Sequence, residues 1–547
     1  MNNAQFYFAR PANEPVYSYS KGTDERIALD EELKKHSKQQ IEIPLIIGGK
    51  EIYTGKTGKV VCPHDHNNVL ATYHNATDKE INMAIEAAMK AHEHWATISW
   101  IERVSISLKI AELISTKYRY LMNAVTMLGQ GKNAYQSEIE AVCETVDFLR
   151  FNAHYVSEIY DDQPHSEKSN LNRVEYRPLE GFVFAVSPFN FTAIASNLSL
   201  APAVLGNTVV WKPSSTALLS NYYLMKIFEE AGMPPGVINF IPGKGSEIGN
   251  IVLNHKDLGG VHFTGSNRTF NQIWKTVAAN VENYKSYPRI VGEAGGKDFI
   301  FVHSSANAKE VATALVRGAF EYQGQKCSAA SRAYVPQSLW EELKKQIGEN
   351  IRLIKKGDVM DLCNFVNAVI DEKAYDKIIG YIQKAKDSDD AEVIFGGTGD
   401  KSKGYFIDPT VIEVKDPHFV TMEEEIFGPV VSIYVYKDED FEKTLELCNN
   451  TSPYGLTGAI FSDDIYARTK ACQVLRYAAG NFYFNDKPTG AVVGQQPFGG
   501  ARQSGTNDKA GSYLNLLRWI SPRSIKETYL PPTDFRYPYM YEEKCYR

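Results

Sequence analysis

Two side chains in this sequence have surroundings that suit chemistry better than packing. Cys327 lies in the segment 325–329, Gln-Lys-Cys-Ser-Ala, where small and polar residues replace the apolar neighbours of a structural thiol. Glu293 lies in the segment 292–297, where glycines allow backbone to approach a ligand and leave the acid uncrowded. A thiol can act as a nucleophile and a carboxylate as a general base. The alternative is a buried cysteine that packs as a small apolar residue beside a glycine turn.

Other segments carry groups suited to binding phosphate. Residues 187–191, 212–215 and 263–268 each follow a short apolar run, so each can place helix N–H groups beside an anion. Taken alone, each is equally consistent with an ordinary β–α turn. The sequence has no G-x-G-x-x-G fingerprint between a predicted strand and a predicted helix.

Two later segments suit a nucleotide and an anion. In the segment 423–429, Glu425 precedes Phe427 by two residues, an arrangement that could bond a ribose and pack on a flat ring. The alternative there is a charged turn ahead of a strand. Residues 490–500 form a glycine-rich loop whose N–H groups could bind an anion, with a flexible connector as the alternative.

Apolar periodicity indicates the elements that must position these groups. Residues 78–158 carry apolar side chains at spacings of three and four, which predicts amphipathic helices. Beyond them, apolar runs alternate with helical segments in two series, which predicts two α/β domains built on mainly parallel sheets. The first series comprises 182–186, 208–211, 237–241 and 260–263, and the second comprises 298–302, 332–335 and 430–436.

Two segments outside these series point to contacts between subunits. Residues 171–178 precede the first series and are predicted to form one arm of a projecting hairpin. Residues 531–541 are too rich in aromatics and proline for a helix, and too aromatic for a typical solvated tail. We expect the second segment to dock on a neighbouring subunit.

Bulk composition narrows the class of protein. A chain of 547 residues is too long for a single hydrophobic core and predicts two or three domains. A net charge of -7 argues against a general nucleic-acid binder. The cysteines lack metal-ligand spacing and are odd in number, so we predict neither a metal site nor a disulfide framework. We therefore predict that the protein resides in a reducing compartment. The cysteines are residues 62, 143, 327, 363, 448, 472 and 545.

Targeting signals are not evident in the sequence. Residues 1–8 lack both a basic segment followed by an apolar stretch and the Arg/Ser-rich pattern of an import leader. No apolar run approaches the roughly 18 residues that span a bilayer, so we predict no membrane insertion. A cytoplasmic protein is expected, or a mitochondrial matrix protein if a leader has been removed.

Taken together and in this order, the motifs resemble the aldehyde dehydrogenase superfamily. The matching segments are 187–190, 212–214, 263–266, 293–297, 324–327 and 425–429, and the resemblance runs from about residue 40 to 530. It implies an α/β fold with a Rossmann-type dinucleotide domain, an α/β catalytic domain and an oligomerisation hairpin. The implied division assigns 1–160 and 181–290 to the dinucleotide-binding part, 291–490 to the catalytic part, and 161–180 with 510–547 to the hairpin and C-terminal segment.

The resemblance also implies catalytic roles. Cys327 would attack an aldehyde as the thiolate to give a thiohemiacetal, which becomes a thioester after hydride transfer. The side-chain amide of Asn190 and the Cys327 backbone N–H would hold the oxyanion, and Glu293 would activate the hydrolytic water. The resemblance implies NAD as cofactor. NADP stays open, because Ser214 and Ser215 stand where many relatives carry an acid that repels a 2′-phosphate.

Binding residues follow from the same resemblance. The implied cofactor residues are Ser187, Lys212, Gly265, Ser266, Asn267, Arg268, Thr269, Glu425 and Phe427. The implied substrate residues are Ser328, Gly490, Ala491, Phe191, Phe498 and Glu144.

A narrower resemblance involves residues 191–194, 325–329, 494–502 and 504–509. These segments are similar to the superfamily members that oxidise L-glutamate 5-semialdehyde, which equilibrates with 1-pyrroline-5-carboxylate, to L-glutamate in proline degradation. A homodimer or larger homo-oligomer is implied, with substrate passed on from proline dehydrogenase as a further possibility. The alternatives are another short semialdehyde such as succinate semialdehyde, a thiol-dependent ester hydrolase without cofactor, and a catalytically silent scaffold.

Overall fold

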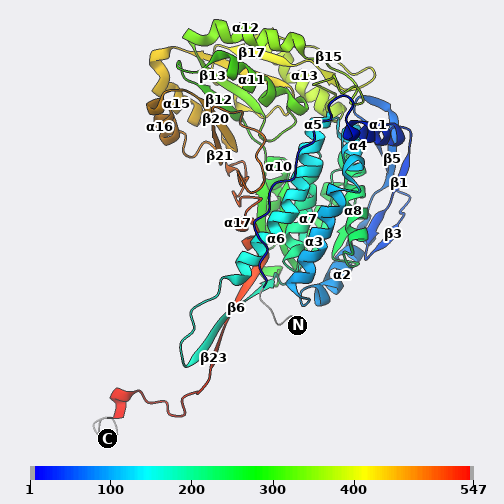
Figure 1. The fold of residues 1–547 in the computed structure, drawn as a ribbon, viewed down its shortest axis with the longest axis vertical. Helices are drawn as coiled ribbons and strands as arrows, with labels where there is room; N and C mark the ends of the chain where they lie inside the picture. Colours follow the sequence, from blue (N-terminus) through cyan, green and yellow to red (C-terminus); the bar gives the residue numbers. More distant parts are fainter. Residues whose placement is uncertain (1–5, 542–547) are drawn as a thin grey trace.

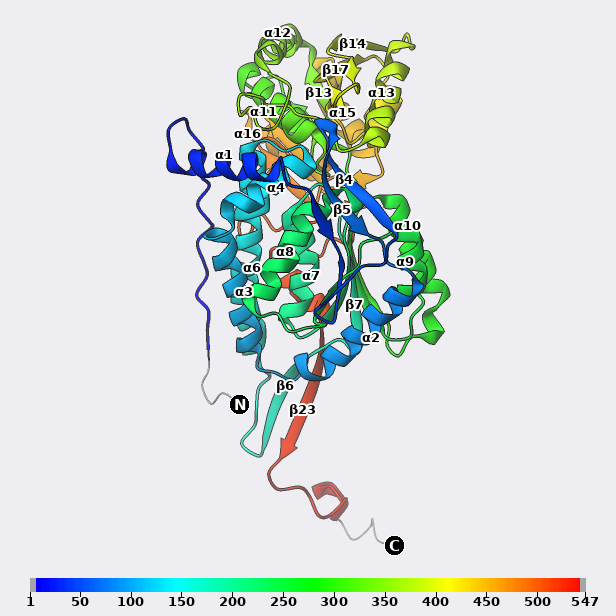
Figure 2. The same cartoon turned by 90° about the vertical axis from the view of Figure 1, so that its right-hand side faces the viewer.

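Two large β-sheets and a projecting ribbon organise the chain (Figures 1 and 2). The structure is a computed structural model that describes residues 6–541. Cys545 and the outer ends of the predicted segments 1–160 and 510–547 lie outside the described residues.

The first sheet has seven strands and corresponds to the first predicted series. Its strands are parallel from β11 to β9, whereas β2 and β3 add an antiparallel edge. The predicted runs are confirmed as strands, and they are mostly apolar, as expected for strands buried on both faces. In spatial order the strands are β11 (Arg289–Glu293), β10 (Leu258–Thr264), β7 (Phe182–Val186), β8 (Thr208–Lys212), β9 (Ile238–Phe240), β2 (Leu45–Ile47) and β3 (Lys50–Ile52).

Helices cover both faces of this sheet. Along β7, Val183 and Ala185 pack with α7 (Thr192–Val204) and α8 (Leu218–Ala231), while Phe182 and Phe184 face the opposite layer. That layer contains α2 (Asp78–Trp95), α9 (Gly245–Val252) and α10 (Asn267–Ala279). Outside α7 and α8 lie α1 (Asp24–His36), α3 (Trp100–Ser115), α4 (Arg119–Gln130), α5 (Ala134–Ser137), the π-helix η1 (Glu138–Glu144) and α6 (Thr145–Asp161). The helical pattern predicted for residues 78–158 is therefore confirmed.

The second sheet also has seven strands and is parallel except at β14. Its order is β14 (Ala391–Phe395), β17 (Thr410–Val414), β18 (Val430–Tyr436), β13 (Ala330–Pro336), β12 (Asp298–Val302), β20 (Thr457–Phe461) and β21 (Asn481–Phe484). One face packs with α11 (Ala308–Phe320) and α12 (Gln337–Leu353), and the other with α13 (Glu372–Lys386), α15 (Phe441–Asn450) and α16 (Ile465–Val474).

Smaller elements complete the described chain. A three-stranded sheet contains β1 (Ile41–Ile43), β5 (Asp65–His74) and β4 (Thr57–Cys62). The short pairs are β15 (Gly399–Asp400) with β16 (Phe406–Ile407), and β19 (Tyr454–Gly455) with β22 (Ala501–Arg502). The remaining helical turns are η2 (Ser215–Ala217), η3 (Val281–Asn283), η4 (Glu321–Gly324), α14 (Val420–Glu423), η5 (Asp438–Asp440), α17 (Tyr513–Leu516), η6 (Leu517–Trp519) and η7 (Pro538–Tyr541).

The predicted projecting arm is a strand, but its partner comes from far along the chain. β6 (Asn170–Pro178) pairs antiparallel with β23 (Ile520–Thr528), and the ribbon extends away from both sheets (Figure 1). The arm is therefore part of a ribbon between distant segments and not a hairpin closed by a short turn. After β23 the chain forms only the short turn η7, in line with the aromatic and proline-rich composition of 531–541. Phe535, Tyr537 and Tyr539 are exposed there.

Within residues 6–541, no helix is long and apolar enough to cross a membrane. The same described range contains no group of His, Cys, Asp or Glu side chains arranged to hold a metal ion.

Candidate active site

The site lies where the carboxyl ends of the first sheet meet the amino ends of the second. Glu293 is the last residue of β11, and the Asn190 loop follows β7. Cys327 shortly precedes β13, which begins at Ala330. Because strands in a parallel sheet all point the same way, their ends collect functional loops on one edge. Two such edges face each other here, which brings distant segments together.

Cys327 is accessible within an otherwise buried loop. It is partly exposed, whereas its neighbours Lys326 and Ser328 are each 5% exposed. Burial raises the pKa of the Cys327 thiol well above its ordinary value, and the carboxylates of Asp298 and Glu293 add to the shift. The free protein therefore holds this sulfur mainly as the thiol. Its exposure disfavours the alternative of a cysteine that serves only as core packing.

The backbone ahead of Cys327 is strained and firmly held. Tyr322, Gln323 and Gly324 all have positive φ angles, of 52°, 55° and 65°. Such conformations cost about 1–2 kcal/mol for each non-glycine residue, so surrounding contacts must maintain them. The Gln323 amide provides two of these contacts, because it donates to the carbonyl oxygens of Gly131 at 2.8 Å and Ala368 at 2.9 Å. The turn thus presents the sulfur in a fixed position.

A second glutamine holds the same turn from the other side. The side-chain oxygen of Gln325 accepts the backbone N–H of Ile370 at 2.8 Å. Sequence reasoning missed Gln323 and Gln325 as positioning residues, since their partners lie far away along the chain. The only available signal was the presence of two long amides beside the predicted nucleophile.

Asn190 lies against the nucleophile loop. Its side chain is 3% exposed, and its Nδ2 donates to the carbonyl oxygen of Gln325 at 3.1 Å. An amide nitrogen has two hydrogens, so one remains to stabilise a negative oxygen beside Cys327.

Glu293 lies on the other side of the same edge. Its Oε2 accepts the backbone N–H of Gly500 at 3.0 Å. Burial raises the pKa of Glu293 well above its ordinary value, and the Gly500 N–H partly offsets this shift. A Cβ at Gly505, which has φ +151°, would lie 2.4 Å from the Gly292 carbonyl oxygen. Only glycine fits there, so the backbone around the acid is tightly packed.

Several predicted cofactor residues lie at the ends of β8 and β10. Lys212 ends β8, and burial lowers the pKa of its ammonium group to about 8. The next segment, Gly265–Thr269, contains the start of α10, whose N-cap Ser266 accepts the Thr269 N–H at 3.4 Å. Ser266, Arg268 and Thr269 are exposed. A helix N-terminus and a partly buried lysine that follow strands of the same sheet suit an anionic ligand.

Two other predicted cofactor residues are already engaged by the protein. Ser187 is buried, and its hydroxyl accepts the indole N–H of Trp211 at 3.0 Å. Asn267 accepts the Gly295 N–H at 3.0 Å and donates to the carbonyl oxygen of Gln503. Both side chains thus hold the surrounding loops in place.

The segment around Glu425 joins the two halves of the site. The Glu425 Oε1 accepts the Gly296 N–H at 3.0 Å. Phe427 has a positive φ of 60°, and its ring meets that of Phe189 edge to face at 5.8 Å between centroids. These contacts bring residues 425–427 of the second half against the loop that follows β7.

The loop that contains Gly490 and Ala491 has free backbone donors. Within residues 6–541, no acceptor is found for either of these N–H groups. The Ser328 hydroxyl donates to the Thr489 hydroxyl at 2.9 Å, which brings the nucleophile loop beside this loop. Phe498 is half-buried in the same loop. The arrangement can bind a carboxylate, because unpaired N–H groups attract anions.

Glu144 lies in a cluster of buried charges beside Phe191. Burial raises the pKa of Glu144 to about 8, and the nearby carboxylate of Glu140 adds to the shift. Glu140 forms a buried ion pair with Lys132, whose ammonium nitrogen lies 4.3 Å from the centroid of the Phe191 ring. Sequence reasoning missed Lys132 and Glu140. Glu140 lies in a π-helix, and a π-helix leaves no recognisable sequence pattern.

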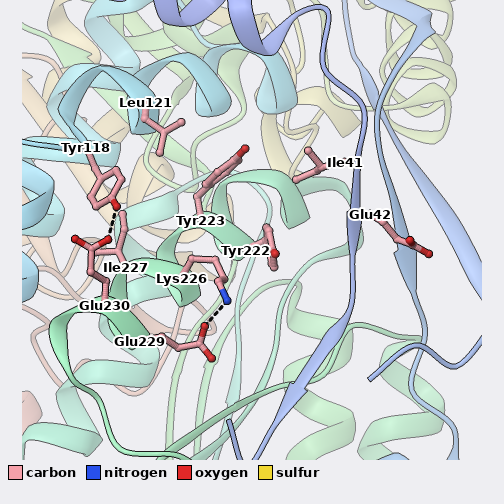
Figure 3. Close-up of a pocket in the computed structure, with 10 residues that line it drawn as sticks. All are labelled: Ile41, Glu42, Tyr118, Leu121, Tyr222, Tyr223, Lys226, Ile227, Glu229 and Glu230. Carbon is pink, nitrogen blue, oxygen red and sulfur yellow. Dashed lines mark hydrogen bonds and ion pairs between the residues drawn. The ribbon is translucent and has the colours of Figure 1, made fainter. Parts of the chain in front are cut away.

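A separate hollow lies on the outer surface between α4 and α8 (Figure 3). Its volume is about 560 Å³, and none of its lining residues belongs to the predicted site. The charged side chains around it are paired, Lys226 with Glu229 and Glu230 with both Lys117 and Tyr118. The hollow therefore offers little unpaired charge to a ligand. Its lining residues are Ile41, Glu42, Tyr118, Leu121, Tyr222, Tyr223, Lys226, Ile227, Glu229 and Glu230.

The family model described as "Aldehyde dehydrogenase family" matches residues 52–523. The chain belongs to the aldehyde dehydrogenase family. The predicted superfamily and α/β fold class are thereby confirmed. The match includes strands β7 to β11 of the first sheet, the whole second sheet and the first four residues of the ribbon strand β23.

Individual members of this family are similar over nearly the whole chain. "Delta-1-pyrroline-5-carboxylate dehydrogenase, mitochondrial" of Dictyostelium discoideum is 53% identical over 98% of this chain and 97% of its own length. A crystal structure of the Delta-pyrroline-5-carboxylate dehydrogenase from Mycobacterium tuberculosis bound with NAD has a TM-score of 0.95 and 48% identity. That match covers 98% of this chain and 100% of the other.

A longer relative shares the same fold. Proline utilization A from Bdellovibrio bacteriovorus has a TM-score of 0.91 and is 29% identical to this aldehyde dehydrogenase. The match covers 95% of this chain but 54% of that protein, so the longer protein has a large part without a counterpart here.

Proposed function

We propose that this aldehyde dehydrogenase oxidises L-glutamate 5-semialdehyde to L-glutamate with NAD, in the degradation of proline. The proposal rests on one observation: the partly exposed Cys327, the Asn190 amide and the Glu293 carboxyl group lie close together where the strand ends of the two sheets face each other. The names of the relatives from Dictyostelium discoideum and Mycobacterium tuberculosis support the substrate.

Cys327 forms the covalent bond to the substrate. The Cys327 thiol first loses its proton to solvent. The resulting thiolate adds to the aldehyde carbon, and the carbonyl electron pair moves to oxygen. The free hydrogen of the Asn190 amide and the Cys327 N–H stabilise that oxyanion, giving a thiohemiacetal on the sulfur. When bound, NAD supplies the acceptor for the hydride that leaves the substrate carbon, and a thioester on Cys327 results.

Glu293 acts in the second half of the reaction. Its carboxylate takes a proton from a water molecule as that water attacks the thioester carbon. The carbon–sulfur bond then breaks, Cys327 leaves as a thiolate, and the new carboxylate is released. In the structure Glu293 bonds the Gly500 N–H, so it must leave this contact to reach the water.

The residues present fit a dinucleotide. Lys212 is a partly buried cation whose pKa is lowered by burial alone, which indicates a positive group that lacks an anionic neighbour. Together with the exposed start of α10, it would hold the adenosine side of NAD. Glu425 would bond a ribose, and Phe427 would pack near the nicotinamide. The absence of an acid at Ser214 and Ser215 leaves some use of NADP open, while the NAD-bound relative supports NAD.

The substrate residues fit an amino acid chain with a carboxylate. The unpaired N–H groups of Gly490 and Ala491, with the Ser328 hydroxyl, would bind the carboxylate. Phe191 and Phe498 would flank the aliphatic chain. Glu144 would contribute a carboxyl group near the entrance of the site.

Wild-type protein tests the proposed function directly. With NAD, we expect the specificity constant for L-glutamate 5-semialdehyde to exceed that for pentanal by about 100-fold or more, because pentanal leaves the carboxylate-binding N–H groups unpaired. The measurement is formation of NADH or NADPH by absorbance, with succinate semialdehyde as a third substrate. Ester hydrolysis without cofactor, in place of aldehyde oxidation, would contradict the proposal.

Replacing Glu425 tests the cofactor site. We expect Glu425→Gln to raise the KM for NAD by about tenfold, because a charged acceptor for the ribose becomes a neutral one. The adjacent Glu424→Gln is a matched control, since Glu424 is exposed and bonds Tyr381 instead. Equal KM values for NAD in the two variants would exclude Glu425 from cofactor binding.

Assembly and location are further parts of the proposal. We infer that the β6–β23 ribbon and the exposed aromatics of 531–541 join subunits into a homodimer or larger oligomer, because a two-stranded ribbon leaves its outer edges unpaired. Residues 1–160 and 181–290 would form the dinucleotide-binding part and 291–490 the catalytic part. A separate proline-oxidising enzyme would supply the substrate. The name of the Dictyostelium discoideum relative supports a mitochondrial location over the expected cytoplasmic one.

A further inference from the structure

Residues 8–20, which we term the N-terminal strap, run along the helical half of the protein before α1 begins (Figure 2). They form neither a helix nor a strand, so side-chain contacts must hold them in place. On α6, Asp147 accepts the Glu14 N–H at 2.7 Å, and the ring of His154 donates to the Phe8 carbonyl oxygen at 2.7 Å. One face of α6 therefore carries the strap, because these positions are seven residues apart.

A buried arginine anchors the middle of the strap. Arg119 of α4 is 1% exposed and donates to the Glu14 carboxylate and the Pro15 carbonyl oxygen, both at 2.6 Å. It also pairs with Glu138, the first residue of η1. Buried pairs of this kind have strict geometry, since an unpaired charge at the same place would be costly. The strap thus has one defined path over the helices.

The strap also contacts the 490–500 loop. Arg10 donates to the carbonyl oxygen of Gly494 at 2.7 Å, and the Asn13 amide donates to that of Val493 at 2.8 Å. In return, the Gln495 amide donates to the Asn13 side-chain oxygen at 2.8 Å. These bonds join residues that are at least 480 positions apart in the sequence.

Asn13 connects the loop to a rigid support. Its amide nitrogen also donates to the buried carboxylate of Asp147 at 2.8 Å. Both amide hydrogens and the amide oxygen of Asn13 are therefore used, which fixes the orientation of the side chain. At the same place the loop lies directly on α6, because a Cβ at Gly494 would fall 2.2 Å from the Phe151 ring. Asn13 thus connects the 490–500 loop to Asp147 of α6 through its hydrogen bonds.

We propose that the N-terminal strap, chiefly through Asn13, is a specificity-determining positioning element that holds the 490–500 loop in the shape that binds the substrate carboxylate. The inference rests on the proposed function for its ligand, since the N–H groups of Gly490 and Ala491 belong to this loop. The strap touches the loop at residues 493–495 and leaves those two N–H groups free. Its effect on catalysis is therefore indirect and is largest for substrates that carry a carboxylate.

The test compares Asn13→Ala with the wild-type protein. For L-glutamate 5-semialdehyde we expect the KM to rise about tenfold while kcat stays within about twofold, because the loop loses two bonds while the Cys327 loop is untouched. For pentanal, which has no carboxylate, kcat/KM is expected to stay within about twofold. A matched control is Ser18→Ala, an exposed strap residue that bonds Glu25 and Ser20 but not the loop.

Arg10 offers a second pair of variants. Arg10→Ala should raise the same KM, whereas Arg10→Lys should restore it in part, because lysine keeps one donor for the Gly494 carbonyl oxygen. A loss of kcat/KM that is equal for both aldehydes would indicate general destabilisation and would overturn the assignment.

Amide hydrogen exchange separates this inference from the proposed function. Residues 490–500 should exchange faster in Asn13→Ala than in the wild type, whichever aldehyde is the substrate. Unchanged exchange would overturn the inference even if the wild type oxidises L-glutamate 5-semialdehyde. Faster exchange in Asn13→Ala, together with a wild type that does not oxidise this substrate, would instead support the strap's contacts with the loop and overturn the proposed function.

Discussion

Cys327→Ala abolishes aldehyde oxidation, with kcat expected to fall by about 10⁴-fold or more, because no other group can form the covalent bond to the substrate carbon. NADH formation from L-glutamate 5-semialdehyde measures the effect. Cys327 is the partly exposed member of a buried loop that two glutamines hold, so removing its sulfur changes little else. Retained binding of NAD, followed by fluorescence, should show that the variant is folded.

A matched control separates the loss of the nucleophile from the loss of a thiol in general. Cys472 is a free, exposed cysteine on α16, far from the strand ends that carry the site. Cys472→Ala should therefore keep wild-type kcat. Substantial aldehyde oxidation by Cys327→Ala would show that Cys327 is not the nucleophile. The strained turn at Tyr322 and Gln323 would then have no role in positioning a catalytic group.

Glu293→Gln separates the two halves of the reaction. We expect steady-state turnover to fall by about 10²–10⁴-fold, because an amide cannot take the proton of the hydrolytic water. The first turnover should still release NADH as a burst, since the thioester on Cys327 forms before Glu293 acts. Glutamine has nearly the shape of glutamate and can still accept the Gly500 N–H, so the loop should keep its position.

The acid should also leave a signature in the pH dependence. Burial raises the pKa of Glu293 well above its ordinary value, so the neutral acid is favoured until the pH passes that raised pKa. Hydrolysis of the thioester should therefore speed up as pH rises through this range in the wild type, and that rise should be absent from Glu293→Gln. Glu282→Gln, at an exposed acid, serves as the control. Loss of the burst together with turnover would contradict this division of roles.

Local patterns were enough to predict the framework. The segments 182–186 and 299–302 are apolar throughout and bounded by glycine or polar residues, so the sequence pattern identified the strands that contain them. Cys327 and Glu293 could be selected as candidates because each has an unusual local composition, and the structure places them near each other. The projecting strand β6 was recognised as well, although its partner β23 was not, since pairing between distant segments leaves no local trace.

The contacts that shape the site could not be predicted in this way. Gln323 and Gln325 bond backbone groups of residues 131 and 367–370, and Lys132 contacts the ring of Phe191, which is 59 positions away in the sequence. Glu144 was expected at the entrance of the site, but its environment depends on Glu140 and Lys132. Such contacts arise from the tertiary fold, and no spacing in the sequence encodes them.

The strap has a consequence for how the enzyme is made. Arg10 and Gly494 are separated by 484 positions, so residues 8–20 leave the ribosome long before their bonding partners in the loop exist. Closing so large a loop is entropically costly until the intervening sheets have formed. The 490–500 loop, the proposed site for the substrate carboxylate, can therefore take its final shape only late in synthesis. A nascent chain would carry Cys327, the proposed nucleophile, for a time before the loop proposed to select the substrate is in place.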